Sequence, residues 1–256
     1  MCESCGCVGD TGHFEVSGSI IKARTDKQVD VLHDLLRAND HQAAHNRAHF
    51  NTAGVLSINL MSSPGAGKTS LLEATIVALR GRLSVAVIEG DLETENDARR
   101  IRATGAQAVQ ITTGNACHLD ADMVHAALHA INLRPLDLLF IENVGNLVCP
   151  ASFDLGQHSN VVLLSVTEGD DKPEKYPVIF RAADLMVVSK LDLMEAVGDF
   201  DPQRAAGYLR RLASAVPVIE LSARSGQGLD VWIDWLIGKH TALRARQYGE
   251  FRERHG

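Results

Sequence analysis

The sequence has little positive charge for its length. Its 256 residues include 25 Lys and Arg against 32 Asp and Glu, which gives a formal net charge of -7 at pH 7. General binding to nucleic acids or anionic membranes depends on clustered Lys and Arg, so the composition argues against both partners. No apolar run approaches the roughly 18 to 20 residues that span a bilayer, and the N-terminal segment lacks the apolar stretch of a signal peptide. We therefore expect a cytoplasmic protein.

Cysteine is also scarce. There are five, an odd number that is too small for a disulfide-stapled fold of this length, so reduced thiols or metal ligands are the better interpretation. They are Cys2, Cys5, Cys7, Cys117 and Cys149.

Hydrophobic residues make up 45% of the chain, enough to bury a substantial core. Residues 1–25 contain few large apolar side chains and are expected to form a flexible metal-binding tail. A helix is predicted over 26–50, a P-loop GTPase domain over 51–240 and a charged C-terminal tail over 241–256. Apolar strand candidates alternate with helical patterns, which predicts an α/β fold with a mostly parallel sheet of about seven strands and helices on both faces. The candidates are 55–61, 85–89, 108–111, 138–141, 161–166, 185–188 and 218–221.

The most informative stretch reads S-S-P-G-A-G-K-T over 62–69. It follows an apolar strand and precedes a helix, so its backbone N–H groups and the helix dipole can hold a phosphate. Lys68, a catalytic candidate, can reach the β and γ oxygens, and Thr69 can offer its hydroxyl to Mg²⁺. Ser62 replaces the first glycine of the usual pattern, and a glycine-rich solvent loop is the simpler alternative. The predicted nucleotide-binding residues here are Gly65, Ala66, Gly67, Lys68, Thr69 and Ser70.

Two acidic residues follow predicted strands. Asp91 and Glu142 are expected at the carboxyl edge of the sheet, where ligands of open α/β sheets gather. Together with Thr69 they form a candidate Mg²⁺ site, because Mg²⁺ prefers oxygen ligands and retains several waters. Asp91 is also the catalytic candidate for orienting the attacking water. Exposed loop acids are the alternative interpretation.

Two later segments indicate the base. Residues 189–192 read S-K-L-D, similar to the N-K-x-D motif in which Asp accepts from guanine N1–H and the exocyclic amine, with Ser189 in place of Asn. Residues 222–224 read S-A-R, which resembles the S-A-K loop that contacts the guanine carbonyl oxygen. Their order after the phosphate loop favours GTP. The predicted base-binding residues are Ser189, Lys190, Asp192, Ser222, Ala223 and Arg224.

The tail cysteines Cys2, Cys5 and Cys7 lie within six residues, close enough to surround one ion. With the terminal amine they can form a square-planar site for Ni(II) or Cu(II), and with His13 a tetrahedral site for Zn²⁺. Their spacing does not choose the metal. A redox-active C-x-x-C is the competing interpretation.

Cys117, His118 and Cys149 form a second candidate metal site. Both segments follow predicted strands, so their loops are expected near the nucleotide edge, with an open position or a site completed by a second subunit. Core thiols and a surface imidazole are the alternative. Histidines also recur every four residues at 41, 45 and 49, and His118, Asp122, His125 and His129 share one stripe of a second predicted helix. Adjacent members can chelate a metal weakly, although a solvated helix face is the simpler reading.

Several of these segments resemble one family. Residues 59–69, 89–91, 115–120, 140–154 (FIENVGNLVCPASFD) and 167–177 are similar to HypB, the nickel-insertion GTPases of [NiFe]-hydrogenase maturation, over about residues 31–237. The resemblance implies a dimerising SIMIBI-type P-loop GTPase. It also implies a high-affinity nickel site at Cys2, Cys5 and Cys7, and a weaker Ni²⁺ or Zn²⁺ site at a dimer interface formed by Cys117, His118 and Cys149.

The expected function is that of a GTP-hydrolysing nickel metallochaperone with Ni²⁺, Zn²⁺ and Mg²⁺ as metals. By resemblance, its partners are a GTP-promoted second copy, the nickel chaperone HypA and the hydrogenase large subunit precursor, and Lys175 acts on nucleotide across the dimer. Alternatives are a urease-type nickel accessory GTPase, a ParA-like ATPase and a non-catalytic nickel or zinc buffer. The N-terminal cysteines favour the hydrogenase branch over the urease branch.

Overall fold

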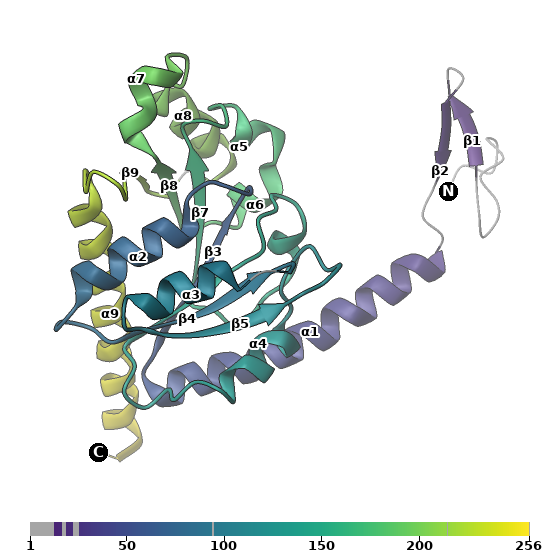
Figure 1. The fold of residues 1–256 in the computed structure, drawn as a ribbon. Coiled ribbons are helices and arrows are strands. Elements are labelled where there is room, and N and C mark those ends of the chain that lie inside the picture. Colours follow the sequence, from purple (N-terminus) through teal and green to yellow (C-terminus); the bar gives the residue numbers. More distant parts are fainter. Residues whose placement is uncertain (1–12, 17–18, 23–25, 94, 214, 256) are drawn as a thin grey trace.

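Figure 1 shows the computed structural model of the chain, which describes residues 13–16, 19–22, 26–93, 95–213 and 215–255, with side chains from residue 33 to residue 249. Its centre is a seven-stranded sheet in the order β5-β4-β6-β3-β7-β8-β9, and every pairing is parallel. This confirms the predicted α/β fold. The strands are β3 (Leu56–Ser62), β4 (Val85–Asp91), β5 (Gln107–Thr112), β6 (Leu138–Glu142), β7 (Ser159–Ser165), β8 (Leu185–Ser189) and β9 (Val218–Glu220).

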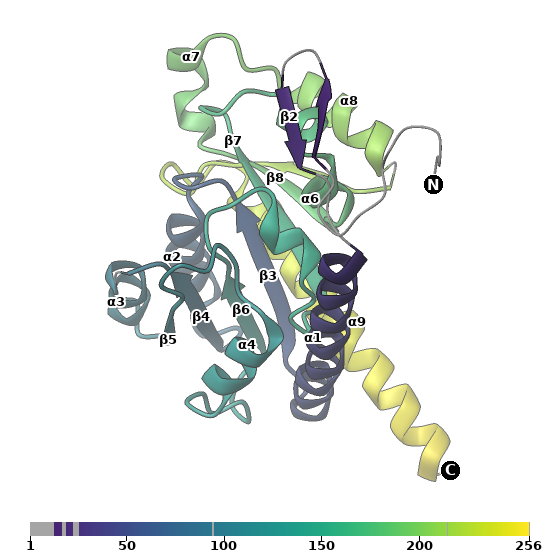
Figure 2. The ribbon, with the colours of Figure 1, turned by 90° about the vertical axis from the view of Figure 1, so that its right-hand side faces the viewer.

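Helices cover both faces of this sheet (Figure 2). One face packs against α2, α3 and α9, and the other against α1, α4, α6 and α8. All seven residues of β3 are buried, as expected for a central parallel strand that is covered on both sides. The helices are α1 (Asp26–Ala53), α2 (Lys68–Leu79), α3 (Asn96–Ala103), α4 (Ala121–Leu128), α5 (Lys172–Lys175), α6 (Pro177–Arg181), α7 (Met194–Val197), α8 (Pro202–Leu212) and α9 (Leu229–His255), with short 3-10 turns η2 (Cys149–Ser152) and η3 (Leu191–Leu193).

The ends of the chain differ from the expectation. Within the predicted tail, β1 (His13–Val16) and β2 (Ser19–Lys22) pair as an antiparallel hairpin. At the other end, α9 continues to His255, through most of the charged tail that was expected over 241–256. The tail sequence after residue 240 holds no proline, so nothing in it stops the helix. Cys2, Cys5 and Cys7 lie outside the described residues.

The core joins α9 to α2. Trp232 is fully buried against the sheet, and its indole N–H donates to the Thr75 hydroxyl of α2 at 2.8 Å. Trp235 stacks on Trp232 with ring centroids 5.5 Å apart. A buried indole that finds a hydrogen-bond partner contributes packing without an unpaired donor, so α9 holds the helix that follows the phosphate loop. Among the described residues, no helix is long and apolar enough to cross a membrane.

Candidate nucleotide-binding and metal-binding site

The phosphate loop connects the central strand β3 to α2. Gly65 and Gly67 have positive φ angles of 73° and 100°, a backbone conformation that glycine adopts without strain. Gly67 is the N-cap of α2 and offers no side chain to the first turn, so the N–H groups of the helix end are available to an anion. The backbone therefore has the conformation that the sequence predicts for a phosphate-binding loop.

Ser62, which replaces the usual first glycine, is part of this loop. The buried Lys68 ammonium donates to the Ser62 hydroxyl at 3.1 Å, and that hydroxyl donates to the Ser63 carbonyl oxygen at 2.6 Å. The substitution thus gives the Lys68 side chain a hydrogen-bond acceptor next to the place a phosphate would take.

Five of the six predicted base-binding residues, all except Ser222, line one pocket of about 240 Å³ next to the phosphate loop. Lys190 has a φ of 62°, the only positive value at a non-glycine residue in the part of the chain that the structure describes. This conformation turns its ammonium back to the Gly65 carbonyl oxygen at 2.6 Å. The hydroxyl of Ser189 donates to the Ala66 carbonyl oxygen at 2.7 Å. Ser189 therefore contacts the phosphate loop even though it replaces Asn.

The two base-recognition segments also contact each other. The Ser222 hydroxyl donates to Asp192 Oδ1 at 2.5 Å and accepts from the Ser225 N–H at 3.1 Å. Ala223 and Arg224 complete the same pocket wall. One carboxylate oxygen of Asp192 is fixed by Ser222, which orients the group that would read a guanine edge.

On the other side of the phosphate loop lies a buried acidic group. The Thr69 hydroxyl donates to Glu142 Oε1 at 2.9 Å, and β4 pairs with β6 so that Glu89 lies directly beside Glu142. Oxygens of Glu89, Asp97 and Glu142 all lie within 4.8 Å of one another. Three carboxyl groups this close cannot all ionise easily, so their protonation depends on the surroundings.

Burial determines the protonation of these acids. It raises the pKa of Glu89 to about 8, with further contributions from the charges of Glu142 and Asp91. Burial also raises the pKa of Glu142 to about 7, against the opposing effect of the Lys68 ammonium. The Oε2 atoms of both residues are buried and have no hydrogen-bond partner among the described residues. Buried, unpartnered carboxylate oxygens fit the hard divalent cation Mg²⁺.

Glu89 is a site residue that the sequence analysis missed. The predicted magnesium ligands were Thr69, Asp91 and Glu142, and the structure brings Thr69 and Glu142 together. Asp91, at the end of β4, accepts from the Leu92 N–H at 2.6 Å and is not part of the closest acidic group. The available signal was the sequence E-G-D, in which an acid closes an otherwise apolar strand two residues before the acid that was chosen.

The structure also brings together Cys117, His118 and Cys149, the second metal site that the sequence predicts. Cys117 Sγ lies 2.8 Å from Cys149 Sγ and 3.8 Å from His118 Nδ1, and both cysteines are free thiols. The three ligand atoms lie within 4.8 Å of one another, and all three side chains are half-buried. Phe153 stacks on the His118 ring at a centroid distance of 3.9 Å. These residues come from the loop before α4 and from the start of η2.

The environment favours the uncharged forms of His118 and Cys149. Burial lowers the pKa of His118, while Asp120 opposes that shift. The hydrogen bond with Cys117, followed by burial, raises the pKa of the Cys149 thiol. A neutral imidazole keeps a free lone pair, whereas the thiols must lose their protons when a metal binds. Metal uptake at this group is therefore expected to release protons.

The loop that carries Cys117 and His118, called the metal loop below, is linked to the acidic group beside the phosphate loop through Asn143. Asn143 directly follows Glu142. Its buried side chain accepts from the Leu119 N–H at 3.1 Å and donates to Asn59 Oδ1 at 3.2 Å. Asn146 donates to the Cys117 carbonyl oxygen at 3.4 Å. Glu142, which accepts from Thr69, is thus followed directly by the loop that hydrogen-bonds to Leu119 and to the Cys117 backbone.

Two glycines permit this close packing. A Cβ on Gly145 would lie 2.8 Å from the Pro64 Cα of the phosphate loop. A Cβ on Gly90 would lie 2.8 Å from the side chain of Leu119, which follows His118. Backbone therefore meets backbone or side chain directly at both contacts, and a movement on one side displaces the other.

Lys175 is not among the residues that line the nucleotide pocket of its own chain. It lies on α5, is exposed, and forms an ion pair with Asp171 at 2.6 Å, which raises the pKa of its ammonium. Its predicted role across a dimer stays a prediction.

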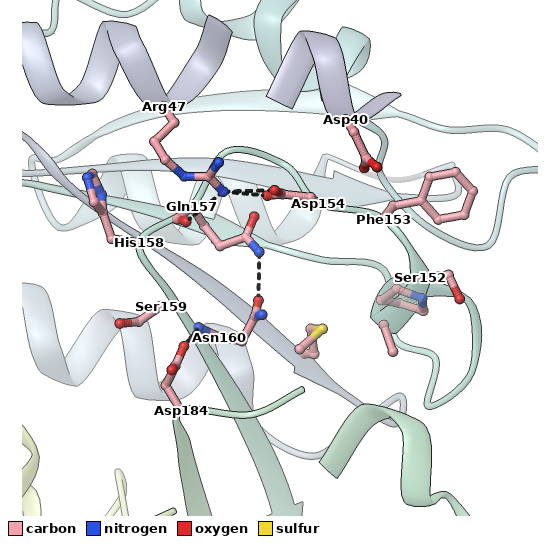
Figure 3. A pocket seen from close by; sticks show the side chains of 13 residues that line it. Asp40, Arg47, Ser152, Phe153, Asp154, Gln157, His158, Ser159, Asn160 and Asp184 are labelled. Carbon is pink, nitrogen blue, oxygen red and sulfur yellow. Dashed lines mark hydrogen bonds and ion pairs between the residues drawn. The ribbon is translucent and has the colours of Figure 1, made fainter. Parts of the chain in front are cut away.

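A separate polar hollow lies under α1 (Figure 3). It has a volume of about 390 Å³ and contains none of the predicted site residues. Arg47 Nη2 contacts both Asp154 oxygens, at 2.8 and 2.9 Å, and Gln157 donates to Asn160 at 3.0 Å. These contacts fasten α1 to the segment that follows η2.

The chain matches a known family of nucleotide-binding proteins. Residues 56–220 match the family described as CobW/HypB/UreG, nucleotide-binding domain. The chain is 53% identical over 221 residues to the hydrogenase maturation factor HypB of Azotobacter vinelandii, covering 86% of this chain and 73% of the relative. It is 47% identical over 231 residues to HypB of Escherichia coli K12, covering 90% and 79%.

Solved structures give the same result. A crystal structure of HypB from Helicobacter pylori in complex with nickel superimposes with a TM-score of 0.77 at 40% identity, covering 80% of this chain and 96% of that one. HypB from Archaeoglobus fulgidus gives a TM-score of 0.75 at 41% identity, covering 80% and 100%. The phosphate loop, the base pocket and the cysteine group all lie on loops at the carboxyl edge of one parallel sheet. The chain belongs to the HypB hydrogenase maturation factors of the CobW/HypB/UreG nucleotide-binding family.

Proposed function

We propose that the chain is a GTP-hydrolysing nickel metallochaperone whose affinity for nickel depends on the bound nucleotide. The observation that carries the proposal is the continuous series of contacts from Thr69 through Glu142 and Asn143 to Leu119, beside Cys117 and His118. Such a series gives the nucleotide a physical route to the metal ligands.

In the proposed reaction, the γ-phosphate lies over the N-terminus of α2. The Lys68 ammonium leaves Ser62 and contacts the β and γ oxygens, where it stabilises charge as the γ-phosphoryl group is transferred to water. Thr69, Glu142 and Glu89 would hold Mg²⁺, which neutralises phosphate charge when bound. Asp91 remains the candidate for orienting the water.

Guanine is the proposed base because the pocket presents a fixed carboxylate. Asp192 accepts from N1–H and the exocyclic amine of guanine, and adenine offers neither donor in that arrangement. The Lys190 stem lies beside the phosphate loop and would cover one face of the base. ATP would leave the Asp192 carboxylate unpaired against the ring, so it should be a poor substrate.

Nickel is the proposed cargo of Cys117, His118 and Cys149. Two thiolates and one imidazole suit Ni²⁺ or Zn²⁺, and three protein ligands leave a position for water or for a second copy of the chain. We propose a homodimer favoured by GTP, in which this group lies at the interface. Delivery to the hydrogenase large subunit precursor, with HypA as a nickel-carrying partner, is proposed from membership of the family.

Coupling between the sites is reciprocal. If GTP changes the affinity for Ni²⁺, then Ni²⁺ must change the preference for GTP over GDP by the same factor. Loss of the γ-phosphate releases Lys68 and Thr69. Glu142, which is hydrogen-bonded to Thr69, and the adjacent Asn143 then move with them. The loop with Cys117 then loses part of its support, which changes metal affinity.

The decisive experiment measures Ni²⁺ affinity of the full chain with Mg²⁺·GDP and with a non-hydrolysable GTP analogue. We expect the two dissociation constants to differ by roughly 5- to 150-fold, the usual range of allosteric coupling. Sedimentation of the same samples reports dimer formation. Equal constants would contradict the coupling, and absence of GTP turnover in the unmodified chain would favour a non-catalytic metal buffer.

A further inference from the structure

A further group of potential metal ligands lies where α1 packs on α4 (Figure 2). His49 of α1 and His125 of α4 have ring centroids 5.6 Å apart, and His125 and the neighbouring His129 have centroids 5.1 Å apart. His49 and His129 are exposed, and His125 is half-buried. Three imidazoles from two packed helices thus face one small region.

Asn46 fixes the tautomer of the central imidazole. Its side chain is fully buried, and its Nδ2 donates to the carbonyl oxygens of Ala121 at 2.8 Å and Leu155 at 3.1 Å. The amide therefore cannot flip, because its oxygen would then face two carbonyl oxygens. Asn46 Oδ1 is left as the acceptor 3.1 Å from His125 Nδ1, so Nδ1 carries the proton.

This arrangement leaves His125 Nε2 with a free lone pair. A histidine that donates through one ring nitrogen to an amide or carbonyl oxygen presents the other nitrogen to a metal in a defined direction. His125 therefore presents Nε2 toward the region that His49 and His129 also face.

We propose that His49, His125 and His129 bind a divalent transition ion with a preference for imidazole ligands, such as Ni²⁺ or Zn²⁺, at a site separate from the Cys117 group. The site differs in chemistry, because it offers nitrogen in place of thiolate, and in location, because its ligands lie on α1, on α4 and at the C-cap of α4. Its ligand atoms are less tightly gathered than those of the Cys117 group. Binding therefore requires rotation of the exposed His49 and His129 side chains onto the ion.

Two further side chains lie within one helical turn of these ligands. His45 precedes His49 by four residues on α1, and Asp122 precedes His125 by three on α4, which places each on the same helix face as its neighbour. Either can supply a fourth ligand in place of water. An all-nitrogen site of this kind is expected to exchange metal faster than a thiolate site, since borderline ions are held less strongly by imidazole alone.

The test uses the full chain with all five cysteines replaced by serine, so that thiolate sites do not contribute. We expect this variant to retain one equivalent of bound Ni²⁺ or Zn²⁺ in calorimetric titration. His125→Ala or His49→Ala in that background should weaken binding roughly 10- to 100-fold. His33→Ala, an exposed histidine on the same helix, is the matched control and should leave binding unchanged.

Two further outcomes decide the proposal. Long-range ¹H–¹⁵N spectra should show the proton of His125 on Nδ1 in the metal-free chain and a change of the Nε2 shift on adding Zn²⁺. A proton on Nε2, or equal loss of binding in His33→Ala, would overturn the site. Retained binding in His49→Ala and His125→Ala that disappears in His13→Ala would place the ion elsewhere and likewise reject it.

Discussion

The two sides of the phosphate loop are prepared for their ligands in opposite ways. On the base side, Ser189 and Lys190 already donate to phosphate-loop carbonyl oxygens, and Ser222 donates to Asp192. On the acidic side, Glu89 and Glu142 are buried together with unpartnered oxygens and raised pKa values. One side is satisfied without ligand, and the other is not.

This difference gives the two sides of the phosphate loop different functions. A pocket that is already hydrogen-bonded needs little rearrangement to bind, so it contributes selectivity for the base. A site with buried, repelling carboxyl groups gains most when a cation and a phosphate arrive, and so it responds most strongly to the ligand. The metal loop is attached to the acidic side through Asn143. The acidic side is the one expected to change when ligand binds.

The largest effect is expected from Lys68→Ala. Removal of the ammonium takes away the charge that stabilises the transferring phosphoryl group and also the positive neighbour of Glu142. GTP turnover should fall by roughly 100- to 1000-fold, measured as phosphate release. Lys172→Ala, whose ammonium lies over the Tyr176 ring, is the control and should turn over normally. Unchanged turnover in Lys68→Ala would reject the catalytic assignment.

Asp192→Asn tests the base side. Asn keeps an oxygen for the Ser222 hydroxyl but presents an amide donor where guanine also has donors, so GTP affinity should fall roughly 100-fold. Xanthosine triphosphate, which has a carbonyl oxygen in place of the amine, should gain affinity. Competition binding with both nucleotides measures the exchange. Glu195→Gln, outside the pocket lining, is the matched control, and parallel weakening of both nucleotides by Asp192→Asn would indicate loss of folding.

Gly145→Ala tests the connection between the sides. Its Cβ would lie 2.8 Å from Pro64 Cα, so one of the two loops must shift. We expect the ratio of Ni²⁺ affinities between GTP-analogue and GDP states to fall from the roughly 5- to 150-fold range toward unity, while each site still binds. Gly207→Ala, where a Cβ meets nothing within 4 Å, should keep the ratio. A retained ratio in Gly145→Ala would show that coupling takes another route.

The smallest effect is on stability. The pKa of Glu89 is about 8 in the folded chain, above its ordinary value, so folding favours the protonated form. The stabilisation is complete below the unfolded-state pKa of about 4.3 and is lost as pH rises through about 8. Without Mg²⁺, the contribution of Glu89 to the melting temperature should therefore fall between pH 5 and pH 8, and the difference between the unmodified chain and Glu89→Gln isolates it from the opposing effect of the lowered His158 pKa.

Glu89→Gln should flatten this profile by about 2 to 4 °C, followed by calorimetry in EDTA. Mg²⁺ with nucleotide should flatten the profile of the unmodified chain as well, because the cation favours the ionised carboxylate. The exposed Glu220→Gln is the control. If the stability of the unmodified chain relative to Glu89→Gln rose with pH over this range, the sign of the Glu89 shift would be contradicted.

The sequence predicted the sheet well because its strands are short apolar runs separated by helical patterns. It also predicted that Cys117 and Cys149 share one edge, since each follows a parallel strand. It did not identify Glu89, because the pairing of Glu89 with Glu142 depends on which strands become neighbours and in what register. Neither property is written in the local pattern of either strand.

Other differences have similarly local causes. The extent of α9 was underestimated because charged residues were read as a tail, although a helix with a solvated outer part tolerates them. The role of Ser62 was not foreseen, because its value depends on where the Lys68 ammonium comes to rest. The sequence places the histidines at 49, 125 and 129 only on two separate helix stripes, because it does not predict that α1 packs on α4.

The hydrogen bond from Trp232 to Thr75 has a practical consequence. The chain has only two tryptophans, and both lie on α9, with Trp232 touching the helix that begins at the phosphate loop. Their ultraviolet emission is thus an unlabelled optical signal located where nucleotide-driven movement of α2 would be felt. A stopped-flow trace of that emission would time the switch in the native chain, with no dye attached.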